Sequence, residues 1–357
     1  MRTAEFQLAV RSCRLAFDPA FAASSDHPNL DWQRFYRLAQ FHRVQGLVWK
    51  SLPRLGSPVP GEVARKIADD AARIAAQNRE SLAECGTLAD ALHGSGIDFL
   101  FLKGLPLGML AYGSPWLKAA VDLDLLIDEA RLDDAVAVLR SCGFRREDGR
   151  PEDIGALRAW HRLRKDSEWG KPGSTARVDL HTRLTDNPAL IPTVGIGSLR
   201  QSVKVTPGCQ LPTLSTDDLF AHLCVHGASS AWFRLKWITD LAALLQPRTS
   251  NEIARLYRRS QELGAGRAAG QALLLADSLY GTLDDCPDLR DRLNADGYTC
   301  WLCRAALRQL AGRPEPVEPT ARPGGTLRIH LTQFLLLPGM AFKASEFIRQ
   351  ARATAAA

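Results

Sequence analysis

The chain lacks the long apolar run that a membrane-spanning helix requires. Its longest candidate, residues 334–337, ends at Pro338 and Gly339, far short of the ~20 apolar residues that cross a bilayer. The N-terminal residues 1–5 include an acid and begin no sustained apolar stretch, unlike a secretory signal. We therefore expect a protein of the cytoplasm that has no membrane partner.

Paired cysteine motifs are also missing. The eight cysteines are scattered through mostly apolar surroundings, a distribution typical of free buried thiols in a reducing compartment. Cys300 and Cys303 have the spacing of a redox or zinc pair, but no second Cys or His pair accompanies them. We expect both residues to lie on a helix and to belong to the hydrophobic core.

The sequence has no basic stripe interleaved with aromatic residues, the usual mark of a nucleic-acid surface. The net charge is +6, which permits a polyanionic partner without requiring one. The 46% hydrophobic and 24% charged content is that of an ordinary globular protein. The 357 residues are enough for two or three domains.

Hydrophobic periodicity predicts an α+β protein dominated by helix, in which a small mixed sheet is flanked by helical regions. The clearest helix is the alanine-rich run at residues 62–93, which Gly94 and Gly96 end. We expect five regions: a helical region at 1–95, an α+β core at 96–212, a helical region at 213–312, a proline-rich linker at 313–325 and a helical tail at 326–357.

Within the core, short apolar runs predict strands at residues 97–102, 122–127 and 177–181, with an extended stretch from Gly143 and an edge strand within 204–211. Helices are expected at 105–112 and 131–142, and residues 147–176 are expected to be irregular. In the C-terminal region the predicted helices are 232–245, 251–263, 265–280 and 298–310.

Two aspartates two residues apart carry the strongest chemical signal. Asp122 and Asp124 lie in the apolar run VDLDLLI at residues 121–127. Side chains alternate along a strand, so both carboxylates share a face, where they repel each other and lose solvation. A divalent cation between them makes the arrangement favourable, and Mg²⁺ suits such ligands together with phosphates. Asp-x-Asp pairs also occur by chance at strand ends and helix caps, and Asp128 is expected to be such a cap.

Further polar residues complete a possible site. Asp179 lies in a later apolar strand and shares a face with His181, so it is a candidate third carboxylate. Lys103 and Gly104 form the turn between a strand and a helix, where backbone N–H groups favour an anion. Lys103 can also be a solvated lysine at the end of a strand. The combination indicates phosphoryl or nucleotidyl transfer.

Together these segments resemble a known family, the bacterial uncharacterised nucleotidyltransferases of the DNA-polymerase-β-like superfamily. The resemblance rests on Leu102-Lys103-Gly104, Ala111-Tyr112, VDLDLLI at 121–127 and VDLH at 178–181, with Asn78, His226 and residues 235–241 also matching. It extends from about residue 32 to residue 245.

The resemblance implies roles for individual residues. Asp122 and Asp124 would bind Mg²⁺ or Mn²⁺ ions that bridge the nucleotide, and Asp179 would be the third metal-binding carboxylate, near the acceptor hydroxyl. Lys103 and Gly104 would contact the triphosphate. Lys118 would also bind the nucleotide. Two departures concern contact with the phosphates. The superfamily has Gly-Ser or Gly-Gly where this chain has Lys103-Gly104. An arginine often precedes the aspartate pair in the family, whereas here Lys118 is the nearest cation; lysine keeps the charge but lacks the bidentate fork of arginine.

The implied function is metal-dependent transfer of a nucleoside monophosphate from a nucleoside triphosphate, with ATP as the expected donor. The acceptor is a hydroxyl or phosphate on a peptide natural product, a protein, a small molecule or an RNA end. The alternative is a catalytically inactive nucleotide-binding or regulatory module of the same fold, which the two departures favour and the three carboxylates oppose.

Several nearby residues have simpler explanations. We expect His181 to be a hydrogen-bonded core residue, and His226, Trp237 and Asp240 to pack and pair helices. The pair at residues 160–161, a tryptophan and a histidine, either lines an acceptor cleft or covers the core.

Overall fold

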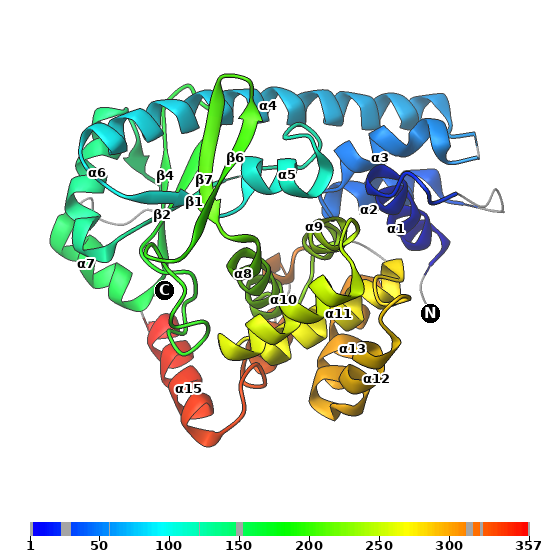
Figure 1. Cartoon of the computed structure of the whole chain (residues 1–357). Coiled ribbons are helices and arrows are strands. Elements are labelled where there is room, and N and C mark those ends of the chain that lie inside the picture. The colour runs from blue at the N-terminus through cyan, green and yellow to red at the C-terminus, as the bar shows by residue number, and fades with distance from the viewer. Residues whose placement is uncertain are drawn as a thin grey trace.

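The computed structural model describes residues 3–22, 30–56, 58–120, 122–147, 153–311, 317–321 and 324–355. Helices hold 61% of the residues and strands 10%, in a small mixed sheet, so the predicted helix-dominated α+β fold is confirmed. In Figure 1 one long helix, α4, runs along the top, with the sheet below one half and helices below the other.

Two polar residues, Thr3 and Asp31, cap the first two N-terminal helices. The elements are α1 (Ala4–Phe17), α2 (Trp32–Phe41), α3 (Gln45–Ser51) and a 3₁₀ turn, η1 (Leu52–Arg54). The carboxylate of Asp31 accepts the backbone N–H of Arg34 at 2.9 Å, which confirms its predicted role as the N-cap of α2.

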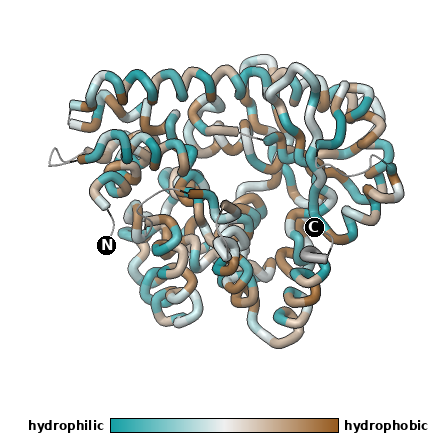
Figure 2. Tube along the Cα trace, turned by 180° about the vertical axis from the view of Figure 1, so that it is seen from behind, coloured by the Kyte–Doolittle hydropathy of each residue, from teal (hydrophilic) through white to brown (hydrophobic). Residues whose placement is uncertain are grey.

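The predicted long helix is α4 (Gly61–Gly94). Its buried face carries Val63, Ile67, Ile74, Leu88 and Leu92, at the spacing of an amphipathic helix. Figure 2 shows hydrophilic and hydrophobic segments alternating along its length. It packs against α2 and α3 near one end and α6 near the other, so it connects the N-terminal helices to the sheet.

The main sheet has the strand order β1-β2-β5-β4-β3. Its strands are β1 (Phe99–Phe101), β2 (Leu123–Ile127), β3 (Arg145–Arg146), β4 (Asp166–Gly170) and β5 (Arg177–His181). β2 and β5 run parallel, and the other described neighbours are antiparallel. The strands predicted at 97–102, 122–127 and 177–181 are confirmed. The helices between them are α5 (Gly104–Tyr112), η2 (Glu129–Arg131) and α6 (Leu132–Ser141).

The prediction that residues 147–176 are irregular is wrong, because they contain α7 (Ile154–Leu163) and β4. Asp153 caps α7 by accepting the N–H of Ala156 at 2.8 Å. β4 has poor intrinsic strand propensity, but it pairs with β5 on one side and β3 on the other, and Trp169 within it is fully buried. Pairing and burial outweigh propensity here.

A separate hairpin, β6 (Arg200–Thr206) and β7 (Cys209–Leu214), replaces the single edge strand expected at 204–211. That expectation missed the turn at Pro207 and Gly208. The hairpin packs against β1 and α5. Asp128, at the end of β2, accepts the N–H of Ala130 at 2.9 Å, which confirms its predicted capping role.

The rest of the chain is helical. The helices are α8 (Thr216–Ser229), α9 (Leu235–Leu245), α10 (Ser250–Glu262), α11 (Gly266–Tyr280), α12 (Pro287–Ala295), α13 (Gly297–Ala311), η3 (Pro319–Ala321), α14 (Leu327–Gln333) and α15 (Met340–Ala355). α12 was not expected. The predicted start of α9 at residue 232 is wrong, because Ala231 and Trp232 have φ of 48° and 52°, which a right-handed helix excludes.

Apolar side chains form two clusters. One joins α1–α3, α5 and α8–α13, and the other joins the second half of α4, the sheet and α6. The expected linker at 313–325 lies partly outside the described residues; within it, the Glu318 carboxylate contacts the Arg234 guanidinium. The five predicted regions stay predictions. All eight cysteines are free, as expected. In the part of the chain that the structure covers, no helix combines the length and hydropathy needed to span a bilayer.

Candidate active site

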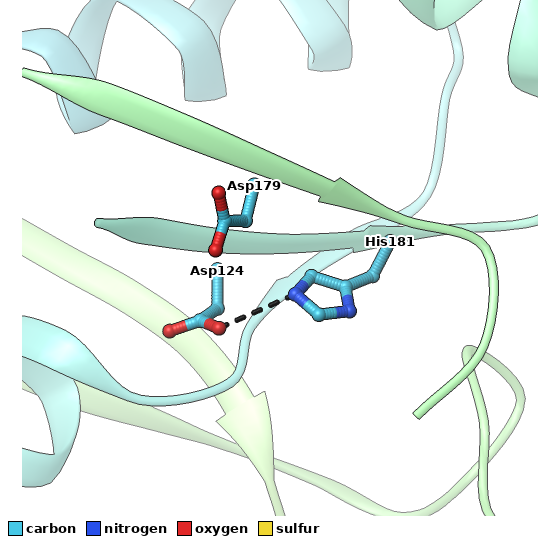
Figure 3. A group of neighbouring side chains, drawn as sticks. All are labelled: Asp124, Asp179 and His181. Carbon is cyan, nitrogen blue, oxygen red and sulfur yellow. Dashed lines mark hydrogen bonds and ion pairs between the residues drawn. The ribbon is translucent and has the colours of Figure 1, made fainter. Parts of the chain in front are cut away.

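Two neighbouring strands place two carboxylates side by side. Asp124 in β2 and Asp179 in β5 are register partners in the parallel pair, so their side chains project from the same face. Figure 3 shows the two carboxylates close together. The sequence predicted that these aspartates converge, and the pairing of β2 with β5 is what brings them together.

A histidine joins this pair. His181 Nε2 donates to Asp124 Oδ1 at 3.2 Å (Figure 3). One ligand atom from each of Asp124, Asp179 and His181 can be chosen so that all lie within 4.8 Å of one another. His181 is 1% exposed, and its Nδ1 has no partner among the described residues. The expectation of a hydrogen-bonded core histidine is therefore met at only one ring nitrogen.

The negative charges of Asp122, Asp124 and Asp179 lie close enough to repel one another. Burial, with the charges of Asp124 and Asp122, raises the pKa of Asp179 to about 8. Burial and Asp124 also raise the pKa of the half-buried Asp122. Asp122 lines the same pocket but is not part of the compact group of three. Carboxylates crowded together beside an imidazole fit a divalent cation.

One lysine already neutralises part of this charge. Lys103 Nζ lies 2.7 Å from Asp124 Oδ1. Burial opposes ionisation of Asp124, but Lys103 and His181 outweigh it and hold its pKa well below the ordinary value. The ammonium of Lys103 thus supplies a positive charge beside the Asp124 carboxylate. The predicted contact of Lys103 with phosphate stays a prediction.

The turn that carries Lys103 is fixed by the backbone. The N–H of Leu102 donates to the carbonyl of Asp124 at 3.0 Å, and Lys103 occupies the N-cap position of α5. Gly104 has φ of 62°, a conformation that glycine adopts readily and L-residues rarely do. The turn therefore needs glycine for its backbone, and it directs the start of α5 toward the carboxylates.

Lys118 lines the same pocket as the aspartates. Lys118 Nζ is 3.2 Å from Asp240 Oδ2 in a buried ion pair, and Tyr112 donates its hydroxyl to Asp240 Oδ1 at 2.7 Å. Asn78 in α4 donates to the carbonyls of Pro115 and Lys118 at 2.6 and 2.8 Å. α4 and α9 therefore both hold this lysine in place.

Two further cations line the pocket, and sequence reasoning missed their role. Lys236 is 8% exposed, and burial with the charges of Lys118 and Arg43 lowers its pKa well below the ordinary value. Arg43 has φ of 56°, a conformation that costs free energy and is often found at functional sites. The sequence could have indicated Lys236, because a lysine is unusual within the apolar start of α9. No sequence pattern indicates Arg43.

A junction between two helix ends positions these cations. The N–H of Leu235 donates to His42 Nδ1 at 3.1 Å, and the N–H of Lys236 donates to the His42 carbonyl at 3.3 Å. The Arg234 guanidinium lies 4.5 Å from the centre of the Phe41 ring. The corner after α2, which carries Arg43, is thus tied to the start of α9.

The acids and cations enclose one pocket of about 160 Å³. His226, Trp237 and Asp240 also line it. These three were expected only to pack and pair helices; Asp240 does pair with Lys118, but all three also face the pocket. Burial lowers the pKa of His226 well below its ordinary value, so this imidazole is neutral at pH 7.

The previously unassigned residues after α7 reach the site's edge. Lys165 lines the pocket and pairs with Asp166, the register partner of His181. Burial opposes ionisation of Asp166, but Lys165 lowers its pKa to about 2. The sequence analysis did not identify Lys165 and Asp166, because it expected their segment to be irregular.

The pair at residues 160–161 covers the sheet. Trp160 Nε1 donates to the carbonyl of Asp166 at 2.8 Å. The two ring nitrogens of His161 lie 3.0 and 3.1 Å from the hydroxyls of Ser167 and Thr182. Neither residue lines the pocket described above, so covering the core is the better of the two interpretations.

Comparison with known families gives an independent finding. The family described as uncharacterised nucleotidyltransferase matches residues 28–281, a span that contains every pocket residue named above. No curated protein matches the chain.

Proposed function

Since this chain belongs to the uncharacterised nucleotidyltransferase family, we propose that it moves a nucleoside monophosphate from a nucleoside triphosphate, with ATP as the donor, to a hydroxyl or phosphate acceptor. The observation that carries the proposal is the register pairing of Asp124 with Asp179. It places the buried Asp124 and the half-buried Asp179 on one face, in a pocket that cations also line. We propose Mg²⁺ or Mn²⁺ as the cofactor, bound at two positions, and the cytoplasm as the location.

The reaction has one bond formed and one broken. The acceptor oxygen attacks the α-phosphorus, and the bond from that phosphorus to the bridging oxygen of the β-phosphate breaks. Pyrophosphate leaves with the electron pair of that bond. The acceptor's proton passes to a carboxylate, a role that we assign to Asp179 because it lies beside Asp124 and lines the pocket.

Asp122 and Asp124 would hold the metal on the nucleotide side, with Asp179 and His181 completing the donor set. When bound, the divalent cation would neutralise charge on the phosphates and favour ionisation of the acceptor. Lys103 Nζ lies 2.7 Å from Asp124 Oδ1, so a cation held by that oxygen would displace this ammonium, which could then contact the phosphates.

The cationic wall would hold the leaving pyrophosphate. Lys118, Lys236 and Arg43 line the pocket together with the aspartates, and the start of α5 adds backbone N–H groups. Lys236 is buried near the cations Lys118 and Arg43, and Asp240 offsets part of their repulsion. A bound triphosphate would relieve this repulsion.

The alternative, a nucleotide-binding module without transfer, is favoured by one observation. The 2.7 Å ion pair between Lys103 and Asp124 competes with any cation for that carboxylate. If the pair persists when nucleotide binds, the site would hold the nucleotide without turning it over.

The test uses ATP labelled at the α-phosphate, Mg²⁺ and candidate acceptors, with mass spectrometry of the products and calorimetry of Mg²⁺–ATP binding. Asp122→Asn removes charge while keeping shape, so it should weaken binding and abolish label transfer. Asp128→Asn is the matched control, since Asp128 is exposed and only caps η2. Unchanged binding and turnover in Asp122→Asn would contradict the assignment. Binding without turnover in the wild-type protein would support the non-catalytic module.

A further inference from the structure

A second cavity adjoins the candidate active site. Its volume is about 310 Å³, and it shares Lys165 and His226 with the first pocket. Its remaining walls come from the loop after β5, the end of α8 and the C-terminal helices α14 and α15. Figure 1 shows α15 near α7, with which it is in contact, and away from α13. The last helix of the chain thus returns to the neighbourhood of the carboxylates.

Buried polar contacts hold this returning helix in place. Glu346 in α15 is 1% exposed, and its Oε2 accepts Nδ2 of Asn187 at 2.8 Å and Nε of Arg349 at 2.9 Å. Gln333 in α14 accepts from Arg349 at 2.9 Å and donates to the carbonyl of Ser229 at 2.7 Å. One network therefore joins the loop, α8, α14 and α15 around the cavity.

The charges that line this cavity balance. Lys165 and Arg349 are cations, Asp186 and Glu346 are anions, and His226 is neutral because burial lowers its pKa. A third cavity, of about 430 Å³, shares Arg43, Ala119 and Ala120 with the first pocket and carries further arginines. The pocket that holds the aspartates thus adjoins both a basic cavity and a cavity without net charge.

A transfer reaction needs two substrates that meet at the carboxylates. The basic end suits the polyanionic nucleotide, and the balanced cavity suits a second molecule of different charge. Its volume is near the lower end of pockets that hold small molecules, roughly 300–1,000 Å³. Polymers with many phosphates would meet Asp186 and Glu346 there, without an excess of cations.

Building on the proposed function, we infer that this cavity is the acceptor site and takes a small hydroxyl compound without net charge. The acceptor hydroxyl would pass Lys165 and His226 to reach the α-phosphorus. Its oxygen would form the new bond to phosphorus, its proton would go to Asp179, and pyrophosphate would leave toward Arg43. α15 would then help to determine which acceptors fit.

The experiment uses the full chain with Mg²⁺–ATP and three acceptor probes: glucose, N-acetyltyrosinamide and a ten-nucleotide RNA with a free 3′-hydroxyl. Ile329→Trp should narrow the cavity, since Ile329 in α14 lines it. Leu331→Trp is the matched control, because Leu331 is 54% exposed on the same helix. Nucleotidylated products are identified by mass, and pyrophosphate release without acceptor measures transfer to water.

We expect transfer to glucose or N-acetyltyrosinamide and none to RNA. Ile329→Trp should reduce that transfer at least tenfold relative to pyrophosphate release to water, and Leu331→Trp should match the wild-type protein in both. Ile329→Ala, which enlarges the cavity, should extend transfer from glucose to maltose or from the tyrosine probe to a dipeptide amide.

Three results would overturn the inference: transfer to RNA alone, pyrophosphate release with no transfer to either uncharged probe, or acceptor use unchanged in both Ile329 variants. Failure of the proposed function looks different, since the wild-type protein would then release no pyrophosphate in any reaction, with or without acceptor.

Discussion

The two walls of the pocket are built in different ways. The acidic wall comes from neighbouring strands, where register alone aligns Asp124 with Asp179. The cationic wall comes from a helix corner, a loop and a helix start, which carry Arg43, Lys118 and Lys236. Strand geometry is local and repeats every two residues. A junction of helix ends depends on tertiary contacts, so only the acidic wall leaves a readable pattern in the sequence.

The largest effect is expected on the acidic wall. Asp179→Ala should bind Mg²⁺–ATP with near-normal affinity, because Asp122, Asp124 and the cations remain. It should lower transfer by about 10²–10⁴-fold, the usual effect of losing a general base. Calorimetry gives the affinity, and product mass spectrometry gives the rate.

Glu168→Ala is the matched control, because Glu168 is the register partner of Asp179 on β4 and is exposed. It should leave transfer nearly unchanged. Wild-type transfer by Asp179→Ala would place Asp179 outside the reaction. A variant that unfolds instead would indicate a structural aspartate.

The acidic wall also shows how far sequence reasoning reached. The runs around Asp124 and Asp179 are apolar and alternate, so strands, face and convergence followed from the residues. The sequence did not identify Lys165 and Asp166 as site residues. They lie just before and at the start of β4, whose sequence DSEWG is stabilised as a strand by its neighbours rather than by its own propensity. The ion pair of Lys103 with Asp124 could not be predicted, because it depends on the backbone of the turn.

A second prediction concerns the junction that builds the cationic wall. Burial lowers the pKa of His42 to about 3, whereas an unfolded histidine has a pKa near 6.5. As pH falls below about 6.5 the unfolded chain takes up this proton and the folded protein does not. The stability from neutral His42 is therefore complete above that pH and is lost progressively down to about pH 3, by on the order of 5 kcal/mol.

Urea unfolding at several pH values measures this loss. His42→Asn is the comparison, because its amide oxygen can accept the Leu235 N–H in place of Nδ1 and does not titrate. The variant should be less stable at pH 7, through lost ring contacts with Phe6 and Phe41, and should lose less stability on acidification. Parallel curves for the two proteins would exclude His42 as a source of acid sensitivity.

The cationic wall itself gives a third, smaller effect. Lys236→Met keeps the buried aliphatic stem and removes the charge, so nucleotide binding should weaken by about 10- to 100-fold, as for loss of one charged hydrogen bond. Removal of a buried cation beside Lys118 and Arg43 should also make the free protein more stable, because their repulsion falls.

Lys204→Met on β6 is the control, since Lys204 is exposed and should alter neither quantity. Calorimetry with Mg²⁺–ATP and thermal unfolding without nucleotide separate the two effects. Unchanged nucleotide affinity in Lys236→Met would remove this lysine from the phosphate site.

This contrast explains why the cations were hard to find. Lys118 was predicted through the family resemblance, but Arg43 and Lys236 reach the pocket through His42, which accepts from Leu235. Neither the left-handed backbone of Arg43 nor that of Ala231 and Trp232 has a sequence signal, because these residues are not glycine. Tertiary contacts impose these conformations, so a local pattern could not reveal them.

The smallest effect is expected where the two walls meet, at the turn into α5. Gly104→Ala places a side chain at φ of 62°, which costs about 1–2 kcal/mol for an L-residue. The added Cβ would lie 3.7 Å from the carbonyl oxygen of Asp122, an ordinary contact, so the effect is conformational and not a clash. Gly86→Ala is the matched substitution, since Gly86 lies inside α4 with nothing within 4 Å of its Cβ position, and there alanine should stabilise by roughly 0.5–1 kcal/mol. Chemical unfolding should therefore shift in opposite directions for the two variants. Equal shifts would mean that the turn tolerates a side chain and that the start of α5 does not depend on glycine.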